Sequence, residues 1–158
     1  MMHGMSVQLE GRLARPDRPA SGDYCPIDRA MSVVGTRSAM LLMREASYGT
    51  TRFDDFVTRV GITDAVASSR LRELVDAGLL SRRPYREAGQ RTRHEYVLTD
   101  SGRDLLPALL ALAAWGRKHA PKRGTPSFSH AGCGEDVTVT LRCSAGHELE
   151  PDELVVTG

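Results

Sequence analysis

The apolar residues of this chain change their spacing at Gly78, from the repeat of a helix to the alternation of a strand. Before Gly78, the segments 53–60 and 64–77 carry apolar residues three and four positions apart, and a short turn containing glycine separates them. After it, residues 79–83 and 94–98 alternate as paired strands do. Two short helices joined by a glycine turn and followed by a hairpin predict a winged helix-turn-helix, a mainly α fold (α+β) with a small antiparallel β-wing.

Two further helices are expected before this motif. The first begins at Pro26, a favourable residue for a first helical turn, and places Ile27, Met31 and Val34 on one face. The second covers about residues 38–47 and is apolar nearly all round. A helix with so little polar surface is expected at the centre of its domain.

A long helix is expected after the wing, over about residues 100–119, with Thr99 as its N-cap and a kink at Pro107. Residues 105–115 contain no polar side chain. A chain of this size rarely covers every side of a terminal helix, so a second copy of the chain is the simplest cover. The side chains expected in that dimer interface are Leu105, Leu109, Leu112 and Trp115.

The helix over 64–77 has an outward face that suits contact with base edges in a DNA groove. Its small side chains allow close approach, and Arg72 offers a forked donor suited to guanine. Arg70 lies nearer the core side and can instead contact phosphate or brace the fold. The residues expected to contact DNA from this helix and its N-cap are Thr63, Ala65, Ser68, Ser69, Arg70 and Arg72. The alternative is an ordinary solvated helix face.

The hairpin is the most basic part of the chain. Residues 81–93 contain five arginines and one glutamate, a net charge of +4, whereas the whole chain has 21 basic and 20 acidic residues. The overall balance excludes a wholly basic nucleic-acid coat. A basic wing is instead expected to contact phosphates, with little base choice but a strong dependence on salt. Its expected DNA contacts are Arg82, Arg83, Arg86, Arg91 and Arg93, and the alternative is a solvated loop.

Composition divides the chain into four expected parts. These are a flexible arm (1–23), the winged-helix DNA-binding and dimerisation domain (24–120), a linker (121–126) and a small C-terminal hairpin unit (127–158). The first 23 residues lack the apolar stretch of a signal peptide, and the longest apolar run, 105–115, is too short to span a membrane. A cytoplasmic protein without membrane contact is therefore expected.

Three cysteines are too few for a disulfide scaffold. In the C-terminal unit, His130-x2-Cys133 and Cys143-x3-His147 supply four possible zinc ligands on either side of the expected hairpin. The alternatives are side chains that only pack, or a Cys133–Cys143 disulfide under oxidation. Apart from this possible structural zinc, no cofactor is expected to be required.

Cys25 directly precedes the first helix, where the helix dipole favours a reactive thiolate. Cys25 is therefore a candidate redox sensor, and the alternative is a half-buried, inert thiol. Residues 24–120 contain no other cysteine. A disulfide would need Cys25 of a second copy or a small thiol.

Residues 25–118 resemble the HxlR-type winged helix-turn-helix regulators, which are relatives of the MarR regulators. The stretches that carry the resemblance are Cys25-Pro26-Ile27, Val34-Gly35-Thr36-Arg37, Arg52-Phe53-Asp54-Asp55-Phe56, Arg70-Leu71-Arg72-Glu73-Leu74, Asp76-Ala77-Gly78-Leu79-Leu80-Ser81-Arg82, Glu95-Tyr96-Val97-Leu98-Thr99-Asp100-Ser101-Gly102, Leu106-Pro107 and Trp115-Gly116. The resemblance implies homodimeric bacterial regulators that bind palindromic operators. It also implies that some members sense oxidants or electrophiles through an N-terminal cysteine.

The sequence thus predicts a transcriptional regulator, expected to be a repressor, that binds double-stranded DNA as a homodimer and responds to an oxidant, an electrophile or a small ligand. The alternative is a winged helix that binds other proteins and carries a zinc-bearing tail, although such a wing has no need of a +4 charge. No catalytic arrangement is evident. His94 and His119 have no nucleophile near them in sequence, and no enzymatic activity is expected.

Overall fold

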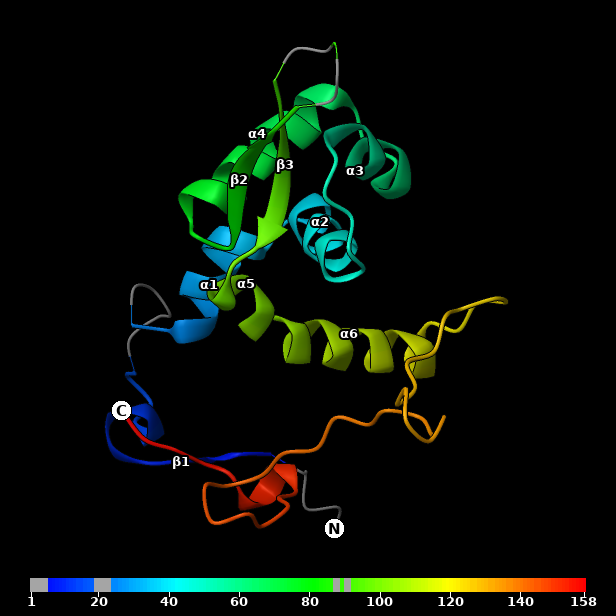
Figure 1. Cartoon of the computed structure of the whole chain (residues 1–158). Coiled ribbons are helices and arrows are strands. Elements are labelled where there is room, and N and C mark those ends of the chain that lie inside the picture. Colours follow the sequence, from blue (N-terminus) through cyan, green and yellow to red (C-terminus); the bar gives the residue numbers. More distant parts are fainter. Residues whose placement is uncertain (1–5, 19–23, 87–88, 90–91) are drawn as a thin grey trace. The chain divides into compact units, whose positions relative to one another are not determined.

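The computed structural model describes residues 6–18, 24–86, 89 and 92–158, and the chain forms two compact units (Figure 1). The winged-helix unit comprises Gly22–Ala120. The terminal unit combines Met1–Ser21 with Pro121–Gly158. The winged-helix unit is mostly helical with one small antiparallel sheet, so the predicted fold class is confirmed.

The winged-helix unit follows the predicted order of elements. These are α1 (Pro26–Val34), α2 (Arg37–Ser47), α3 (Phe53–Val60), α4 (Asp64–Asp76), β2 (Leu80–Tyr85), β3 (Arg93–Leu98), α5 (Asp100–Asp104) and α6 (Leu106–His119). The wing strands are longer than predicted, because Pro84 and Tyr85 still pair with His94 and Arg93. A proline is tolerated there because β2 is an edge strand.

Three threonines fix the starts of helices in the winged-helix unit. Thr36, Thr63 and Thr99 are the N-caps of α2, α4 and α5. Their hydroxyls accept the backbone N–H groups of Ala39, Val66 and Gly102 at 3.1, 3.3 and 3.1 Å. Each such cap stabilises a helix by about 1 kcal/mol. The caps predicted at Thr63 and Thr99 are confirmed.

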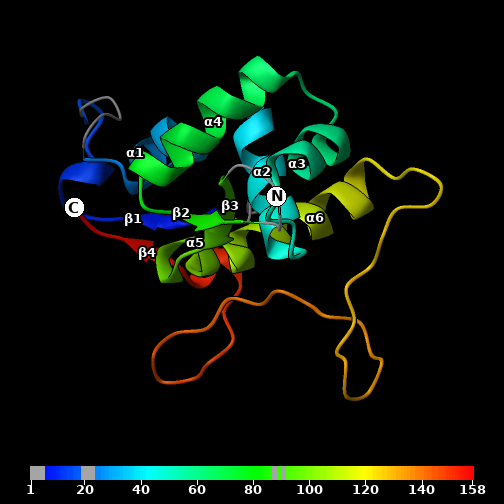
Figure 2. The same cartoon turned by 45° about the horizontal axis from the view of Figure 1, so that its top comes forward.

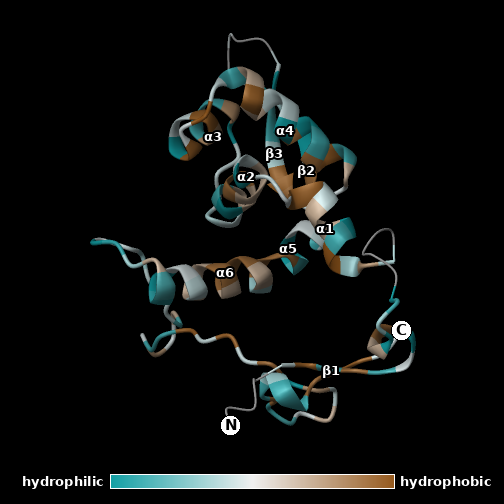
Figure 3. Cartoon of the chain, turned by 180° about the vertical axis from the view of Figure 1, so that it is seen from behind, coloured by the Kyte–Doolittle hydropathy of each residue, from teal (hydrophilic) through white to brown (hydrophobic). Residues whose placement is uncertain are grey.

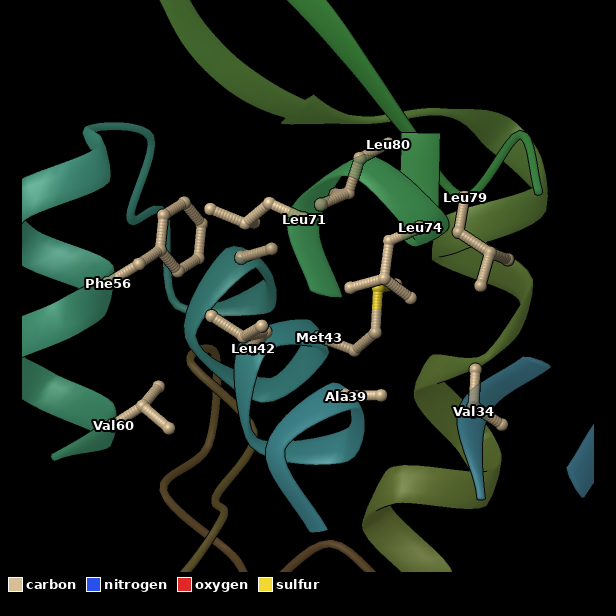
Figure 4. Packing of buried hydrophobic residues seen from close by; sticks show 11 residues of the cluster. Val34, Ala39, Leu42, Met43, Phe56, Val60, Leu71, Leu74, Leu79 and Leu80 are labelled. Atoms are coloured by element: carbon tan, nitrogen blue, oxygen red, sulfur yellow. The ribbon is translucent and has the colours of Figure 1, made fainter. Parts of the chain in front are cut away.

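One apolar core joins α2, α3, α4 and the start of the wing (Figure 4). Its largest fully buried side chains are Phe56, Leu42, Met43, Leu71, Leu74 and Leu80. Burying a side chain of this size contributes about 1.5–3 kcal/mol. Because Ala67, Leu71 and Leu74 turn one side of α4 to this core, the opposite side of α4 faces outward.

The wing is joined to the segment before α3. Arg52 forms an antiparallel bridge with Glu95, and the N–H of Tyr96 donates to the carbonyl oxygen of Thr51 at 2.8 Å. Residues 51–52 thus lie beside β3 through this isolated bridge. This pairing fixes the base of the wing relative to the start of α3.

The predicted kink at Pro107 is a complete break between α5 and α6. Leu105 separates the two helices, and Pro107 lies in the first turn of α6. A proline removes one helical hydrogen bond and its ring clashes with the carbonyl four residues earlier. Starting a new helix at Leu106 places Pro107 where its missing N–H costs little.

The face predicted for α1 is only partly buried. Val34 is 6% exposed and belongs to the core, but Ile27 and Met31 are 72% and 53% exposed. Within the chain, α1 contacts α2 and α4, and its last residue, Val34, packs in the core. The helical repeat correctly groups these three residues on one face, but most of that face lies outside the chain's own core.

The terminal unit contains a short strand within the arm that was expected to be flexible, in the described part 6–18. Gln8 and Leu9 form β1, which pairs in parallel with β4 (Val155–Val156) near the other end of the chain. The amide of Gln8 also donates to the carbonyl oxygen of Asp152 at 2.9 Å. The described part of this arm, residues 6–18, is therefore held by the C-terminal segment through backbone hydrogen bonds.

The tail also differs from the single hairpin predicted for residues 127–158. Two short turns replace it, one closed by a bridge between Ser129 and Asp136 and the other by a bridge between Arg142 and Glu148. The apolar alternation after Val137 does not produce paired strands in this segment. Among the helices of the described residues, none is long and apolar enough to cross a lipid bilayer.

Candidate nucleic-acid interface

The outward side of α4 presents small polar and basic side chains. Ala65, Ser69 and Arg72 are exposed, as is the N-cap residue Thr63. Ser68 is half-buried at the flank. This distribution follows from the buried side of α4, because residues three and four positions apart share a face. An exposed α4 face of this width can enter a major groove.

Arg70 and Arg72 have different surroundings. Arg70 is half-buried and forms an ion pair with Glu73 one turn later, while the Ser69 hydroxyl donates to Glu73 at 3.0 Å. The hydrogen bond from Arg70, and then that from Ser69, lowers the pKa of the Glu73 carboxyl. Arg72 is exposed and has no ion-pair partner among the residues that the structure describes. Arg72 is therefore the α4 arginine available for a base, and Arg70 is engaged on the helix surface.

Val66 was missed by the sequence analysis. It lies in the first turn of α4 and is 40% exposed, although it is apolar. An apolar side chain next to Ala65 on this face can contact the methyl group of thymine. The exposed position follows from the buried positions Ala67 and Leu71, so the helical repeat could have identified it.

The wing carries its arginines on the outside of both strands. Arg82, Arg83 and Arg93 are exposed on β2 and β3, and Arg86 is exposed just after β2. A nitrogen of Arg82 lies 3.1 Å from the ring nitrogen Nδ1 of His94 on the opposite strand. Arg91 lies outside the described residues. By the alternation of the strands, Arg83 and Arg93 lie on one face of the hairpin and Arg82 lies on the other, so the placed arginines make both faces of the wing basic.

Arg52, which the sequence analysis did not select as a site residue, contacts the wing at Tyr85. Its guanidinium carbon lies 3.3 Å from the centre of the Tyr85 ring, at the far end of β2. A cation over an aromatic face contributes about 0.5–2 kcal/mol. Together with the bridge from Arg52 to Glu95, this contact holds the wing near the start of α3.

The four residues predicted for a dimer interface fall into two groups. Leu105 and Leu109 pack against the chain's own core. Leu112 and Trp115 are 56% and 62% exposed. Every residue of α6, all of which the structure describes, is at least partly exposed, and Figure 3 shows its apolar turns. A single chain therefore leaves the outer side of α6 uncovered.

Cys25 is the N-cap residue of α1 and is partly exposed. Its carbonyl oxygen accepts the N–H of Arg29 at 3.1 Å, so the residue is fixed at the helix start. The sulfhydryl makes no capping hydrogen bond. The residue is thus partly exposed and fixed by the backbone at the start of α1.

The four predicted zinc ligands are brought together only in pairs. Nδ1 of His130 lies 3.2 Å from Sγ of Cys133, and Sγ of Cys143 lies 3.5 Å from Nδ1 of His147. Among the described residues, no group of three or more potential ligands surrounds one point. All three cysteines are free, so no Cys133–Cys143 disulfide is present.

Comparison with known proteins places this arrangement among transcriptional regulators. The model of the family described as HxlR-like helix-turn-helix matches residues 33–124. The uncharacterised HTH-type transcriptional regulator Rv3095 of Mycobacterium tuberculosis is 40% identical over 126 residues, which cover 78% of each chain. The uncharacterised HTH-type regulator YdeP of Bacillus subtilis is 30% identical over 103 residues, 63% of this chain and 79% of its own.

Solved structures show the same fold. The crystal structure of PA1607, a candidate transcription factor, is similar with a TM-score of 0.71 and 33% identity, and covers 80% of this chain and 89% of its own. The redox regulator HypR in its reduced form is similar with a TM-score of 0.56 and 29% identity, over 61% of this chain and 94% of its own.

Proposed function

Because this chain belongs to the HxlR-like helix-turn-helix family and is a DNA-binding transcriptional regulator of that type, we propose that it acts as a homodimeric repressor on an inverted-repeat operator. The observation that carries this proposal is the exposed side of α4 beside the arginine-bearing wing. A regulator that acts on the chromosome acts in the cytoplasm, and we infer this location.

In the proposed complex, α4 enters the major groove. Arg72 donates a forked pair of hydrogen bonds to guanine, and Ala65, Val66 and Ser69 allow close approach of the helix to base edges. Thr63 and Ser68 contact the backbone or bases at the rim of the groove. Arg70, paired with Glu73, contacts phosphate or holds the helix surface in shape.

The wing supplies affinity rather than base choice. The wing neutralises phosphates beside the groove through its exposed arginines Arg82, Arg83, Arg86 and Arg93. Arg91 is included because of its place in the sequence. Each neutralised phosphate releases counterions, so binding weakens steeply as salt is added. A protein-binding wing would not need this charge.

A second copy of the chain is the proposed cover for the outer side of α6. Leu112 and Trp115 are largely exposed in one chain, and Ile27 and Met31 add exposed apolar surface on α1. A dimer would place two α4 helices at half-sites about one turn of DNA, roughly 10 base pairs, apart. The inverted repeat follows from the two-fold symmetry of such a dimer.

The proposed signal is an oxidant or an electrophile that modifies Cys25. Similarity to the redox regulator HypR supports an oxidant, and the partly exposed thiol at the start of α1 supports this residue. A small ligand bound by the dimer is the alternative signal.

A binding selection tests the proposal. The purified full chain is mixed with duplexes that carry a random central segment, and the bound fraction is sequenced over several rounds. An enriched inverted repeat with half-sites about one helical turn apart is expected. No enrichment above the starting pool would contradict sequence-specific binding, and enrichment of a single half-site would contradict the dimer.

Two substitutions assign the recognition helix. Arg72→Ala should weaken binding to the selected site by about 1–3 kcal/mol and relax the preference at one base pair. Arg70→Ala should weaken binding with the base preference unchanged, because Arg70 is held by Glu73. Equal loss of preference in both variants would contradict this division of roles.

A further inference from the structure

The tail of the terminal unit contains two turns, and each places a histidine and a cysteine side by side. The distance from Nδ1 to Sγ is 3.2 Å in the His130–Cys133 turn and 3.5 Å in the Cys143–His147 turn. We propose that these four residues together bind one zinc ion, which stabilises the tail.

The distances within the two pairs are close to those of a zinc site. Zinc lies about 2.3 Å from a cysteine sulfur and about 2.0–2.1 Å from a histidine nitrogen in tetrahedral sites, which separates two such ligands by about 3.6 Å. Each pair is therefore near the length of one edge of the ligand tetrahedron. Two pairs supply four ligands, the number that a structural zinc site requires.

Each turn is closed by the backbone N–H of a glycine, across five residues in the first turn and four in the second. The N–H of Gly134 donates to the carbonyl oxygen of His130 at 2.8 Å, and the N–H of Gly146 donates to that of Cys143 at 2.9 Å. Both glycines have positive φ, 79° and 89°, which other residues rarely adopt. The backbone therefore holds each histidine close to its cysteine before any metal arrives.

Antiparallel bridges close both turns from outside. Ser129 pairs with Asp136 around the first turn, and Arg142 pairs with Glu148 around the second. Across the second turn, the side chains of Arg142 and Glu148 also form an ion pair at 2.5 Å. Backbone and side-chain contacts thus hold the ends of the second turn together.

The terminal unit lacks the apolar core that would hold such a tail. None of its described residues is buried, and its one pair of strands is two residues long. Small units without a core usually need a metal or disulfides, and metal binding then supplies folding free energy. All three cysteines are free, so no disulfide stabilises the tail in this structure, and a bound metal would supply stabilisation that a core does not.

Figure 2 shows the two turns as separate loops in the orange part of the chain. Among the described residues, the four side chains do not yet surround one point. Zinc binding would therefore bring the two loops together and reposition residues 134–142 between them. Coupling between metal binding and folding is common in small zinc-binding units.

Metal content and cobalt spectra of the full chain test this proposal. The purified protein should contain one zinc per chain. After removal of zinc by a chelator under reducing conditions, titration with Co²⁺ should end at one ion per chain, with the visible absorption of a tetrahedral site and thiolate-to-cobalt absorption from two thiolates.

Substitutions identify the ligands. Cys133→Ser and Cys143→Ser should each halve the thiolate-to-cobalt absorption, and His130→Gln and His147→Gln should leave it intact. Each of the four substitutions should weaken Co²⁺ binding by at least about 10–100-fold. Loss of a residue that only hydrogen-bonds to a zinc ligand already lowers metal affinity by roughly this factor. Cys25→Ser and His119→Gln, both in the winged-helix unit, are the matched controls and should bind one Co²⁺ with the parent's spectrum.

Limited proteolysis of the parent chain, with and without a chelator, tests the proposal even if a variant loses the fold of its tail. Chelation should expose residues 127–158 to cleavage while residues 24–120 stay intact. The proposal would be overturned if no cobalt bound, if two ions bound per chain with one thiolate each, or if one ion bound per two chains. It would also be overturned by a tail that resists protease equally with and without metal.

Discussion

The guanidinium carbon of Arg52 lies 3.3 Å from the centre of the Tyr85 ring and thereby joins the start of α3 to the far end of β2. The contact therefore links the first helix of the helix-turn-helix to the wing. Its backbone counterpart is the bridge between Arg52 and Glu95. The side-chain contact and the backbone bridge thus add to the packing of Leu80, Tyr96 and Leu98 against the core in holding the wing beside the helix-turn-helix.

Replacement of Tyr85 tests this relationship. Tyr85→Leu should keep the apolar contact but remove the aromatic face, which costs up to about 2 kcal/mol. We expect weaker binding to operator and random DNA alike, measured by fluorescence anisotropy, and a thermal midpoint lowered by several degrees. Tyr48→Leu removes the other tyrosine that lies near an arginine, Arg44 at 5.8 Å, and serves as the control. If Tyr85→Leu and the parent bound DNA with equal affinity, the contact between Arg52 and Tyr85 would not be needed to position the wing.

The wing arginines should act through charge. Arg93→Ala is expected to weaken binding to all sequences and to lower the slope of log affinity against log salt by about 0.9, the value for one lost phosphate contact. Arg103→Ala removes an exposed arginine on α5 that pairs with Asp100, and its slope should equal the parent's. A loss of base preference in Arg93→Ala would instead indicate direct base contact by the wing.

The helix boundaries could be predicted because local signals determine them. Thr63 and Thr99 satisfy backbone N–H groups at helix starts, and Gly61 ends α3 with a φ of 70°. Pro107 marks the break between α5 and α6 for an equally local reason. The outward side of α4 follows from the same helical repeat, so most of the candidate site could be located from sequence.

The remaining contacts join residues that no local pattern connects. Leu9 in β1 pairs with Val156, and two-residue strands carry too few side chains to show alternation. Glu45 is 6% exposed because Arg44 and Thr50 donate to its carboxylate, although its residue type suggests a surface position. The contact of Arg52 with Tyr85 likewise depends on tertiary packing.

The dimer can be tested at a position that one chain leaves uncovered. Leu112 is 56% exposed, so Leu112→Glu should leave the chain folded but place an unpaired charge in a packed dimer interface. Sedimentation should show a monomer, and operator binding should fall because both half-sites are no longer engaged together. Tyr48→Glu, at another exposed apolar position, should remain a dimer. A parent chain that sediments as a monomer at micromolar concentration would contradict the interface.

Gly102 tests the packing between α5 and the turn before β2. A methyl group at this position would collide with the carbonyl oxygen of Leu79, a backbone atom that has little room to move. Gly102→Ala should lower the free energy of unfolding by about 1–3 kcal/mol, as overpacking usually does. Gly116→Ala, in α6, meets no atom within 4 Å and should be neutral or stabilising by up to about 1 kcal/mol. The free energies of unfolding of both variants and the parent are measured in urea at the same chain concentration. If Gly102→Ala were as stable as the parent, the turn before β2 would be able to shift.

Oxidation of Cys25 tests the proposed signal. Diamide accepts two electrons and two protons when it joins Cys25 to a small thiol such as glutathione, or to Cys25 of a second copy, as a disulfide. The added group lies at the start of α1, near exposed Ile27, and would disturb any dimer surface that α1 shares with α6. Interfaces of this kind often hold one of two arrangements, so the spacing of the paired α4 helices can change.

The expected result is a fall in operator affinity of at least about tenfold, which corresponds to a coupling of about 1.4 kcal/mol. A reductant should restore the affinity, and Cys25→Ser should bind the operator equally before and after diamide. Because Cys133 and Cys143 can also be oxidised, the same comparison is made in a chain with both replaced by serine. The response should persist in that double variant, since its only thiol is Cys25. If the parent and Cys25→Ser respond alike, or neither responds, Cys25 has a structural role and the effector must act elsewhere on the dimer.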